Sequence, residues 1–146
     1  MVKVPIAIMI VDDEPDFVEM LSLRLADQGH RIRSAGTGQE ALEALKEEEP
    51  EVIILDIKMP GMDGIETLKT IKARYPLVEI ILLTGHGSID TAVEGLKSGA
   101  FDYLLKPAGF EDLLAKLEEA RDRRAGQEER IRRAEARAMV RKTGGM

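Results

Sequence analysis

The stretch IAIMIVDDEP, residues 6–15, sets the pattern for the whole chain. Its first six residues are continuously apolar, which is typical of a strand buried on both faces of a parallel sheet. Three acidic residues follow where such a strand ends, and Pro15 suits the first turn of a helix. The stretch therefore predicts a buried strand, a carboxylate-rich turn and a helix in immediate succession.

Short apolar runs of the same kind recur along the chain, separated by segments whose apolar residues have helical spacing. The later runs are 31–35, which is the weakest, 52–55, 80–83 and 103–105. Strand and helix thus alternate five times with short connections. This order predicts an α/β fold, a (βα)5 doubly wound domain with a five-stranded parallel sheet.

Polar residues and glycines mark the expected helix ends. Thr37 followed by Glu40 three residues later is a capping-box pattern, and Asp90 is a candidate cap of a later helix. Gly29 and Gly99 stand where two helices should stop, since glycine readily takes the left-handed backbone conformation there. These residues predict where three of the helices begin or end.

Length and composition restrict the protein to one small acidic domain with a short appendage. The 146 residues carry a net charge of −6 and include no Cys, so disulfides, thiolate metal sites and cysteine nucleophiles are all excluded. No apolar run approaches the roughly 18 residues of a membrane span, and no signal-peptide cleavage pattern follows the first run. We therefore expect a cytoplasmic protein without a membrane segment.

The charge is divided unevenly along the chain. Residues 1–120 hold 12 Lys or Arg and 23 Asp or Glu, a net −11, whereas residues 121–146 hold nine and four, a net +5. The basic segment is rich in helix formers and its charges are spaced to pair along a helix, so it is expected to extend the last helix, with Gly126 as a weak point. Because its charges alternate in sign and lack aromatic neighbours, direct nucleic-acid binding is disfavoured.

The residues that end or follow the strands carry the chemistry. In a doubly wound sheet, ligands bind beyond the carboxyl ends of the strands. Asp12 and Asp13 follow the first strand, Asp56 the third, Thr84 closes the fourth and Lys106 the fifth. Three carboxylates, a hydroxyl and an ammonium group are therefore expected at one edge of the sheet.

Crowded carboxylates repel one another unless a cation lies among them, and oxygen ligands favour a hard divalent ion. Mg²⁺ typically takes one or two carboxylates and keeps its other positions for water and phosphate oxygens. Lys106 would then neutralise phosphoryl oxygens. The expected cofactor is therefore Mg²⁺, in a site that a phosphoryl group completes.

Four motifs at these strand ends resemble the CheY-like receiver domain of response regulators in two-component, or phosphorelay, signalling. They are VDDEP at 11–15, DIKMPGMDG at 56–64, Thr84, and GAFDYLLKP at 99–107, in the right order and spacing. The resemblance covers roughly residues 5–122. It implies a flavodoxin-like strand order of 2-1-3-4-5, a receiver domain over residues 1–122, and a charged helical extension over 123–146 without a separate effector domain.

The resemblance implies that the protein is modified on an aspartate. Asp56 would accept a phosphoryl group from a histidine of a partner kinase and become an aspartyl phosphate. Asp13 and Asp56 would bind Mg²⁺ directly, with the backbone carbonyl of Lys58 as a third ligand. Asp12 would act on the ion through water.

The resemblance also implies a switch. Lys106 would hold the phosphoryl group, Thr84 would turn its hydroxyl onto a phosphoryl oxygen, and Tyr103 would follow it inward. Pro107 resembles the family's cis proline, and Gly64 belongs to the turn after the acceptor. The fourth helix, fifth strand and fifth helix would form the surface that changes. The protein is thus expected to be a signalling switch that assists its own phosphorylation and dephosphorylation, not an enzyme.

Two further residues are expected to tune the lifetime of the phosphoryl group. Lys58 stands two residues after the acceptor, and His86 stands two residues after Thr84. Both would flank the route by which water reaches the phosphoryl group.

Two rival classes fit less well. An aspartyl-phosphate phosphatase of the haloacid dehalogenase type would need a second Asp where this chain has Lys58, and a cap domain. A flavodoxin-like FMN carrier would need a hydroxyl- and glycine-rich loop where this chain has DDEP. The sequence leaves open whether the chain is the receiver part of a longer transcriptional regulator, and whether two copies pair through the fourth-helix surface or the C-terminal helix.

Overall fold

The computed structural model describes residues 4–58, 63–85 and 88–142. Along these residues, five strands alternate with five helices. The strands are β1 (Ala7–Val11), β2 (Arg31–Ala35), β3 (Val52–Leu55), β4 (Glu79–Thr84) and β5 (Asp102–Leu105). The helices are α1 (Pro15–Asp27), α2 (Gly38–Glu47), α3 (Gly64–Arg74), α4 (Ile89–Lys97) and α5 (Phe110–Lys142). The predicted alternation is confirmed.

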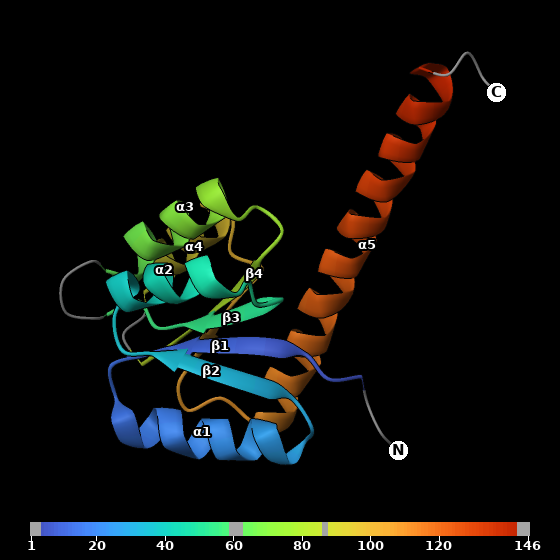
Figure 1. The fold of residues 1–146 in the computed structure, drawn as a ribbon. Coiled ribbons are helices and arrows are strands. Elements are labelled where there is room, and N and C mark those ends of the chain that lie inside the picture. Colours follow the sequence, from blue (N-terminus) through green and yellow to red (C-terminus); the bar gives the residue numbers. More distant parts are fainter. Residues whose placement is uncertain (1–3, 59–62, 86–87, 143–146) are drawn as a thin grey trace.

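The strands form one parallel sheet in the order β2-β1-β3-β4-β5, as the receiver resemblance implied (Figure 1). Val11 at the end of β1 pairs with Ala35 of β2 and with Leu55 of β3. Leu82 of β4 pairs with Leu55 and with Tyr103 of β5. The carboxyl ends of all these strands therefore reach the same edge of the sheet, which we call the carboxyl edge.

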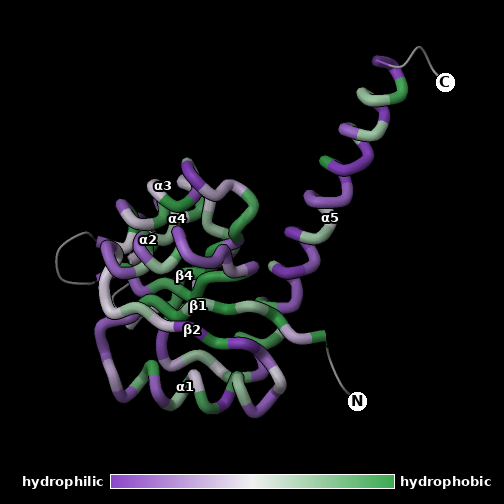
Figure 2. The backbone as a smooth tube through the Cα atoms, viewed as in Figure 1, coloured by the Kyte–Doolittle hydropathy of each residue, from purple (hydrophilic) through white to green (hydrophobic). Residues whose placement is uncertain are grey.

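Helices cover both faces of the sheet, because residues of the central strands alternate between two apolar clusters. On β1, Met9 and Val11 join the cluster that includes α2 and α3, whereas Ile8 and Ile10 join the cluster that includes α1 and α5. Figure 1 shows α2, α3 and α4 on one side of the sheet and α1 on the other, and Figure 2 shows hydrophobic strands between them. Each fully buried Ile or Leu contributes about 1.5–3 kcal/mol to folding.

Several helix ends lie where the sequence predicts them. Pro15 is in the first turn of α1, and the Thr37 hydroxyl accepts a hydrogen bond from the Glu40 backbone N–H at 3.1 Å. Gly29 and Gly99 have φ values of +94° and +110°, so both lie in the left-handed region that favours glycine.

The expected cap at Asp90 is wrong. The helix α4 begins at Ile89, two residues earlier than a cap at Asp90 would place it, and its cap is Ser88, whose hydroxyl accepts a hydrogen bond from the Thr91 backbone N–H at 3.1 Å. Asp90 lies in the first turn instead, where the helix dipole stabilises a negative charge. Both residues are good helix-start signals, and the hydroxyl that comes first takes the cap.

Helix α5 is continuous over 33 residues and runs through Gly126 without a break. Its buried residues, Leu113, Leu114, Leu117 and Ala120, all lie near its start. Beyond them the helix projects away from the sheet (Figure 1). Two arginines hold it at the body: Arg123 forms an ion pair with Glu79 at 2.9 Å, and Arg124 donates to the Pro50 carbonyl at 2.9 Å.

Among the residues that the structure describes, no helix is both long enough and apolar enough to cross a membrane.

Candidate functional site

The carboxyl edge brings together the polar residues that the sequence placed at strand ends. Asp12 and Asp13 follow β1, Asp56 follows β3, Thr84 is the last residue of β4 and Lys106 follows β5. Asp12, Asp56 and Thr84 are 4%, 2% and 0% exposed, whereas Asp13 is exposed. Buried polar groups of this kind, gathered at one point of an apolar fold, indicate a site rather than a surface.

Three carboxylates form the centre of the site. One oxygen each of Asp12, Asp13 and Asp56 lies within 4.8 Å of the others. Burial raises the pKa of Asp12 above its ordinary value, although the hydrogen bond from Lys106 acts in the opposite direction. The Asp56 Oδ1 atom is buried and has no hydrogen-bond partner among the described residues. A group of hard oxygen ligands with one buried oxygen unsatisfied fits a divalent cation.

The Lys106 ammonium group lies next to these carboxylates. Its Nζ atom donates to Asp12 Oδ2 at 2.8 Å and to Glu14 Oε1 at 3.0 Å. It also lies 4.0 Å from the centroid of the Phe17 ring, a favourable cation–π contact. Burial acts to lower the pKa of Lys106, but the hydrogen bonds to the two carboxylates and the nearby charges of Asp12 and Asp56 together outweigh burial, so its pKa is raised. Lys106 is therefore a fixed positive charge at the carboxyl edge.

Neither Glu14 nor Phe17 is assigned a role from the sequence. From the sequence, Glu14 is part of the VDDEP motif but is indistinguishable from other exposed acids, and Phe17 is expected only on the apolar face of a helix. Their contact with Lys106 joins residues about 90 positions apart in the chain. Only the strand order, which brings the turns after β1 and β5 to the same edge of the sheet, could have indicated it.

The backbone next to Asp56 is held by Gly64. The Gly64 N–H donates to the Ile57 carbonyl at 2.7 Å. A Cβ atom on Gly64 would overlap the Asp56 carbonyl oxygen and the Ile57 Cα, so only glycine allows α3 to begin this close to the residues that follow β3. The sequence places Gly64 in the turn after Asp56, whereas the structure makes it the first residue of α3, where the close contact requires glycine.

The remaining predicted residues are placed as follows. The Lys106–Pro107 peptide bond is cis, as expected. Lys58 is exposed, and His86 lies outside the described residues. The Tyr103 ring is half-buried against the cluster that includes α2 and α3. Its hydroxyl is buried without a hydrogen-bond partner in the described part of the chain, and burial, followed by the nearby charge of Asp56, raises its pKa.

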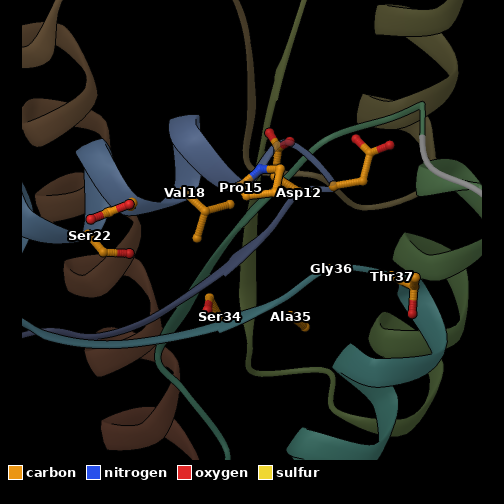
Figure 3. Close-up of a pocket in the computed structure, with 10 residues that line it drawn as sticks. Asp12, Pro15, Val18, Ser22, Ser34, Ala35, Gly36 and Thr37 are labelled. Carbon is orange, nitrogen blue, oxygen red and sulfur yellow. The ribbon is translucent and has the colours of Figure 1, made fainter.

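A hollow of about 520 Å³ opens beside the carboxylates (Figure 3). Its lining residues come from the turn after β1, from α1, and from β2 with the turn after it: Asp12, Asp13, Pro15, Val18, Glu19, Ser22, Ser34, Ala35, Gly36 and Thr37. In Figure 3, Asp12, Pro15 and Val18 face Ser34, Gly36 and Thr37 across it. The hollow gives ions and solvent a path to Asp12 and Asp13.

Comparison with known proteins agrees with this geometry. The profile of the response regulator receiver domain matches residues 8–118. The transcriptional regulatory protein ZraR of Escherichia coli (strain K12) is 42% identical over 115 residues, which are 79% of this chain and 26% of ZraR. The DNA-binding transcriptional regulator NtrC of the same organism is 41% identical over 113 residues, 77% of this chain and 24% of NtrC. The chain thus spans about a quarter of the length of these curated relatives.

Solved structures give the same result. A CheY-like response regulator receiver domain protein from Methanospirillum hungatei JF-1 superposes with a TM-score of 0.81 at 31% identity, covering 85% of this chain and 99% of that one. The receiver domain of NtrX from Brucella abortus superposes with a TM-score of 0.75 at 35% identity, covering 79% and 98%. The strand order, the acidic site at the carboxyl edge and these matches together show that the chain belongs to the response regulator receiver domain family.

Proposed function

We propose that this receiver domain accepts a phosphoryl group on Asp56 and uses the modification to switch a protein-binding surface. The observation that carries the proposal is the Asp56 carboxylate, which is 2% exposed and has one oxygen without a hydrogen-bond partner among the described residues. Such an oxygen destabilises a fold unless a ligand or a reaction uses it. The two neighbouring carboxylates and Lys106 supply the charges that phosphoryl transfer needs.

The proposed phosphodonor is a phosphohistidine of a histidine kinase. A carboxylate oxygen of Asp56 attacks the phosphorus atom, and the P–N bond to the histidine breaks as the new P–O bond forms. The imidazole nitrogen leaves with the bonding electron pair. The products are an acyl phosphate on Asp56 and a free histidine on the kinase.

The proposed cofactor is Mg²⁺, held by Asp13, Asp56 and the backbone carbonyl of Lys58, with Asp12 acting through water. The close carboxylate oxygens and the unsatisfied Oδ1 of Asp56 support this assignment. When bound, the ion neutralises charge on the attacking carboxylate and on the phosphoryl oxygens. The exposed side chain of Asp13 leaves its carboxylate accessible to an ion that enters from solvent.

Three residues would read the modification. Lys106 would hold one phosphoryl oxygen, and the Thr84 hydroxyl, at the buried end of β4, would donate to another. Tyr103 would then move further inward, which its unsatisfied buried hydroxyl favours if the move brings an acceptor within reach. Lys58 and His86 would set how fast water removes the phosphoryl group.

The output would be a change in binding at the surface formed by α4, β5 and the start of α5. Apolar side chains are exposed there: Ile89, Val93, Leu96 and Leu105, at 83%, 42%, 45% and 56%. Such a patch favours a protein partner over solvent, either a target or a second copy of the chain. Because the phosphoryl group ends on the protein itself and hydrolysis resets it, we class the protein as a switch and not as a turnover enzyme.

We assign residues 1–122 to the receiver domain and residues 123–146 to an extension, which is helical over its described part, 123–142. A second candidate function is that of a receiver segment that controls a transcriptional regulator. It is favoured by the names of the relatives ZraR and NtrC, each of which is about four times the matched length.

Phosphorylation can be tested directly. The protein is incubated with Mg²⁺ and acetyl phosphate, and intact mass spectrometry compares wild type with Asp56→Asn. We expect a base-labile gain of one phosphoryl group in wild type only. Absence of that gain in wild type, or an equal gain in Asp56→Asn, would overturn the proposal.

A further inference from the structure

We infer that Glu14 is a positioning residue: it holds the Lys106 ammonium group at the first turn of α1, away from Asp56, and so slows phosphorylation. This inference rests on the proposed function of Asp56. It assigns to an exposed acid a control over the rate at which the switch is set.

The hydrogen bonds of Lys106 support the inference. The structure gives its Nζ atom two acceptors, Asp12 Oδ2 at 2.8 Å and Glu14 Oε1 at 3.0 Å. Meanwhile the Oδ1 atom of Asp56 is buried without a donor among the described residues. The positive charge that a phosphoryl group on Asp56 would need is therefore bound to other carboxylates.

The two acceptors differ in what else they do. Asp12 is 4% exposed, its Oδ1 accepts the Glu14 backbone N–H at 2.9 Å, and its carboxylate belongs to the group that would hold a cation. A cation among the carboxylates would attract the Asp12 carboxylate and so weaken its hydrogen bond with Lys106. Glu14, whose side chain is 60% exposed, would then be the remaining acceptor for Lys106.

The Glu14 side chain has no competing local role. Glu14 is the N-cap residue of α1, a position where a side-chain oxygen usually accepts a backbone N–H of the first turn. Its side chain makes no such capping bond and reaches Lys106 instead. Phe17, one turn along α1, lies 4.0 Å from the same ammonium group. The start of α1 thus binds the Lys106 ammonium group through both Glu14 and Phe17.

The expected size of the effect follows from exposure. An ion pair with one partner largely in water is weak, and its loss changes an equilibrium by about 1.5- to 5-fold. Lys106 must leave Glu14 to reach a phosphoryl oxygen, so removing the Glu14 charge should accelerate phosphorylation by a factor in that range.

The test compares Glu14→Gln with Asp16→Asn, which removes the same charge from the same turn of α1. Asp16 is exposed and belongs neither to the carboxylate group nor to the partners of Lys106 that the structure gives. With acetyl phosphate and saturating Mg²⁺, we expect Glu14→Gln to be phosphorylated about 1.5- to 5-fold faster than Asp16→Asn. Equal rates, or a slower Glu14→Gln, would overturn the inference.

Two further measurements show whether Glu14 acts through Lys106. In protein without Mg²⁺, the ¹⁵N resonance of the Lys106 ammonium group should shift in Glu14→Gln and stay in place in Asp16→Asn. Glu14→Gln should raise the affinity for beryllofluoride, a stable mimic of the phosphoryl group, when Lys106 is present, and should leave that affinity unchanged in a Lys106→Met background. An unmoved resonance, or an undiminished effect in that background, contradicts the inference.

The outcomes separate the two proposals. If wild type gains no phosphoryl group at all, the proposed function fails, while the resonance of Lys106 still reports on its contact with Glu14. If wild type is phosphorylated on Asp56 and Glu14→Gln behaves like Asp16→Asn, the inference fails alone.

Discussion

Asp56 and Glu79 are two buried carboxylates at opposite ends of the neighbouring strands β3 and β4, and they differ in their partners. Glu79 begins β4 and is 3% exposed, and it lies 2.9 Å from Arg123 and 3.6 Å from Lys72. Asp56 follows β3 and is 2% exposed, yet one of its oxygens has no hydrogen-bond partner among the described residues. Removing a buried acid that two cations share leaves those cations without their counter-charge and destabilises the fold, whereas a buried acid with an unsatisfied oxygen is available for a ligand.

The comparison predicts that neutralising Asp56 impairs phosphorylation, whereas neutralising Glu79 impairs stability. Asp56→Asn should lower phosphorylation by acetyl phosphate about 100-fold or more, because the nucleophile is lost. Its free energy of unfolding should stay the same or rise by up to about 1 kcal/mol, because one of three crowded like charges is gone. Mass spectrometry and urea denaturation measure the two quantities. A large loss of stability in Asp56→Asn would show that its charge supports the fold.

Glu79→Gln should have the reverse pattern. It leaves Lys72 and Arg123 without their shared counter-charge, and we expect the free energy of unfolding to fall by about 2 kcal/mol, less than for a fully buried pair since Arg123 is 54% exposed. The phosphorylation rate should not change. The control is Glu94→Gln, because the ion pair between Glu94 and Lys69 is exposed on both sides. Its free energy of unfolding, measured by urea denaturation, should change by less than about 0.5 kcal/mol. Equal effects for the two variants would refute the distinction.

Mg²⁺ should stabilise the domain through the carboxyl edge. At ten times its dissociation constant the ion adds about 1.4 kcal/mol, or roughly 4 °C in Tm. Burial raises the pKa of Asp12 above its ordinary 3.8. As the pH rises from 3.8 through the raised pKa, Asp12 ionises and the fold loses stability. Below the raised pKa, protons compete with the cation for Asp12. Thermal denaturation with Mg²⁺ or EDTA should therefore show a larger gain at about pH 7.5 than at about pH 4.5. A gain independent of pH, or one retained in Asp56→Asn together with Asp13→Asn, would count against this site.

The smallest expected effect concerns the helix at the other edge. Arg123→Ala should lower the free energy of unfolding by about 0.5–1 kcal/mol, because it removes one half-exposed partner of Glu79. The matched control is Arg133→Ala further along α5, which loses only an exposed pair with Glu129. We expect the control to change stability by less than about 0.3 kcal/mol. Indistinguishable values would mean that Arg123 does not fasten α5 to the body.

Much of the fold could be predicted because strands buried in a parallel sheet have continuous apolar runs in the sequence. The run at 31–35 is the weakest for a physical reason: β2 is an edge strand, and its Arg31 is exposed. The start of β4 was missed by one residue, since Glu79 looks like a boundary and not like the first residue of a buried strand. Its charge is paired with Lys72 and with Arg123, 44 residues later, and no local pattern contains the pair with Arg123.

The site could be predicted as a set of residues but not as a network. Strand ends identify Asp12, Asp56 and Lys106, because parallel strands deliver their carboxyl ends to one edge. Which acceptor Lys106 has depends on side-chain direction across 92 and 94 positions in the chain, and the contact with Glu14 beside Asp12 exists only because the turns after β1 and β5 meet at the carboxyl edge. Ser88 shows the same limit locally, since two good capping residues, Ser88 and Asp90, stand only two positions apart.

The length of α5 has a mechanical consequence. Residues 121–142 form one unbroken helical rod of about 33 Å, clamped at its base by Arg123 and Arg124. A rod of that length turns a tilt of about 10° at its base into a displacement of about 6 Å at its tip. Helix α5 therefore has the geometry of a lever: a small repacking where Leu117 meets the sheet becomes a movement larger than a side chain at the far end.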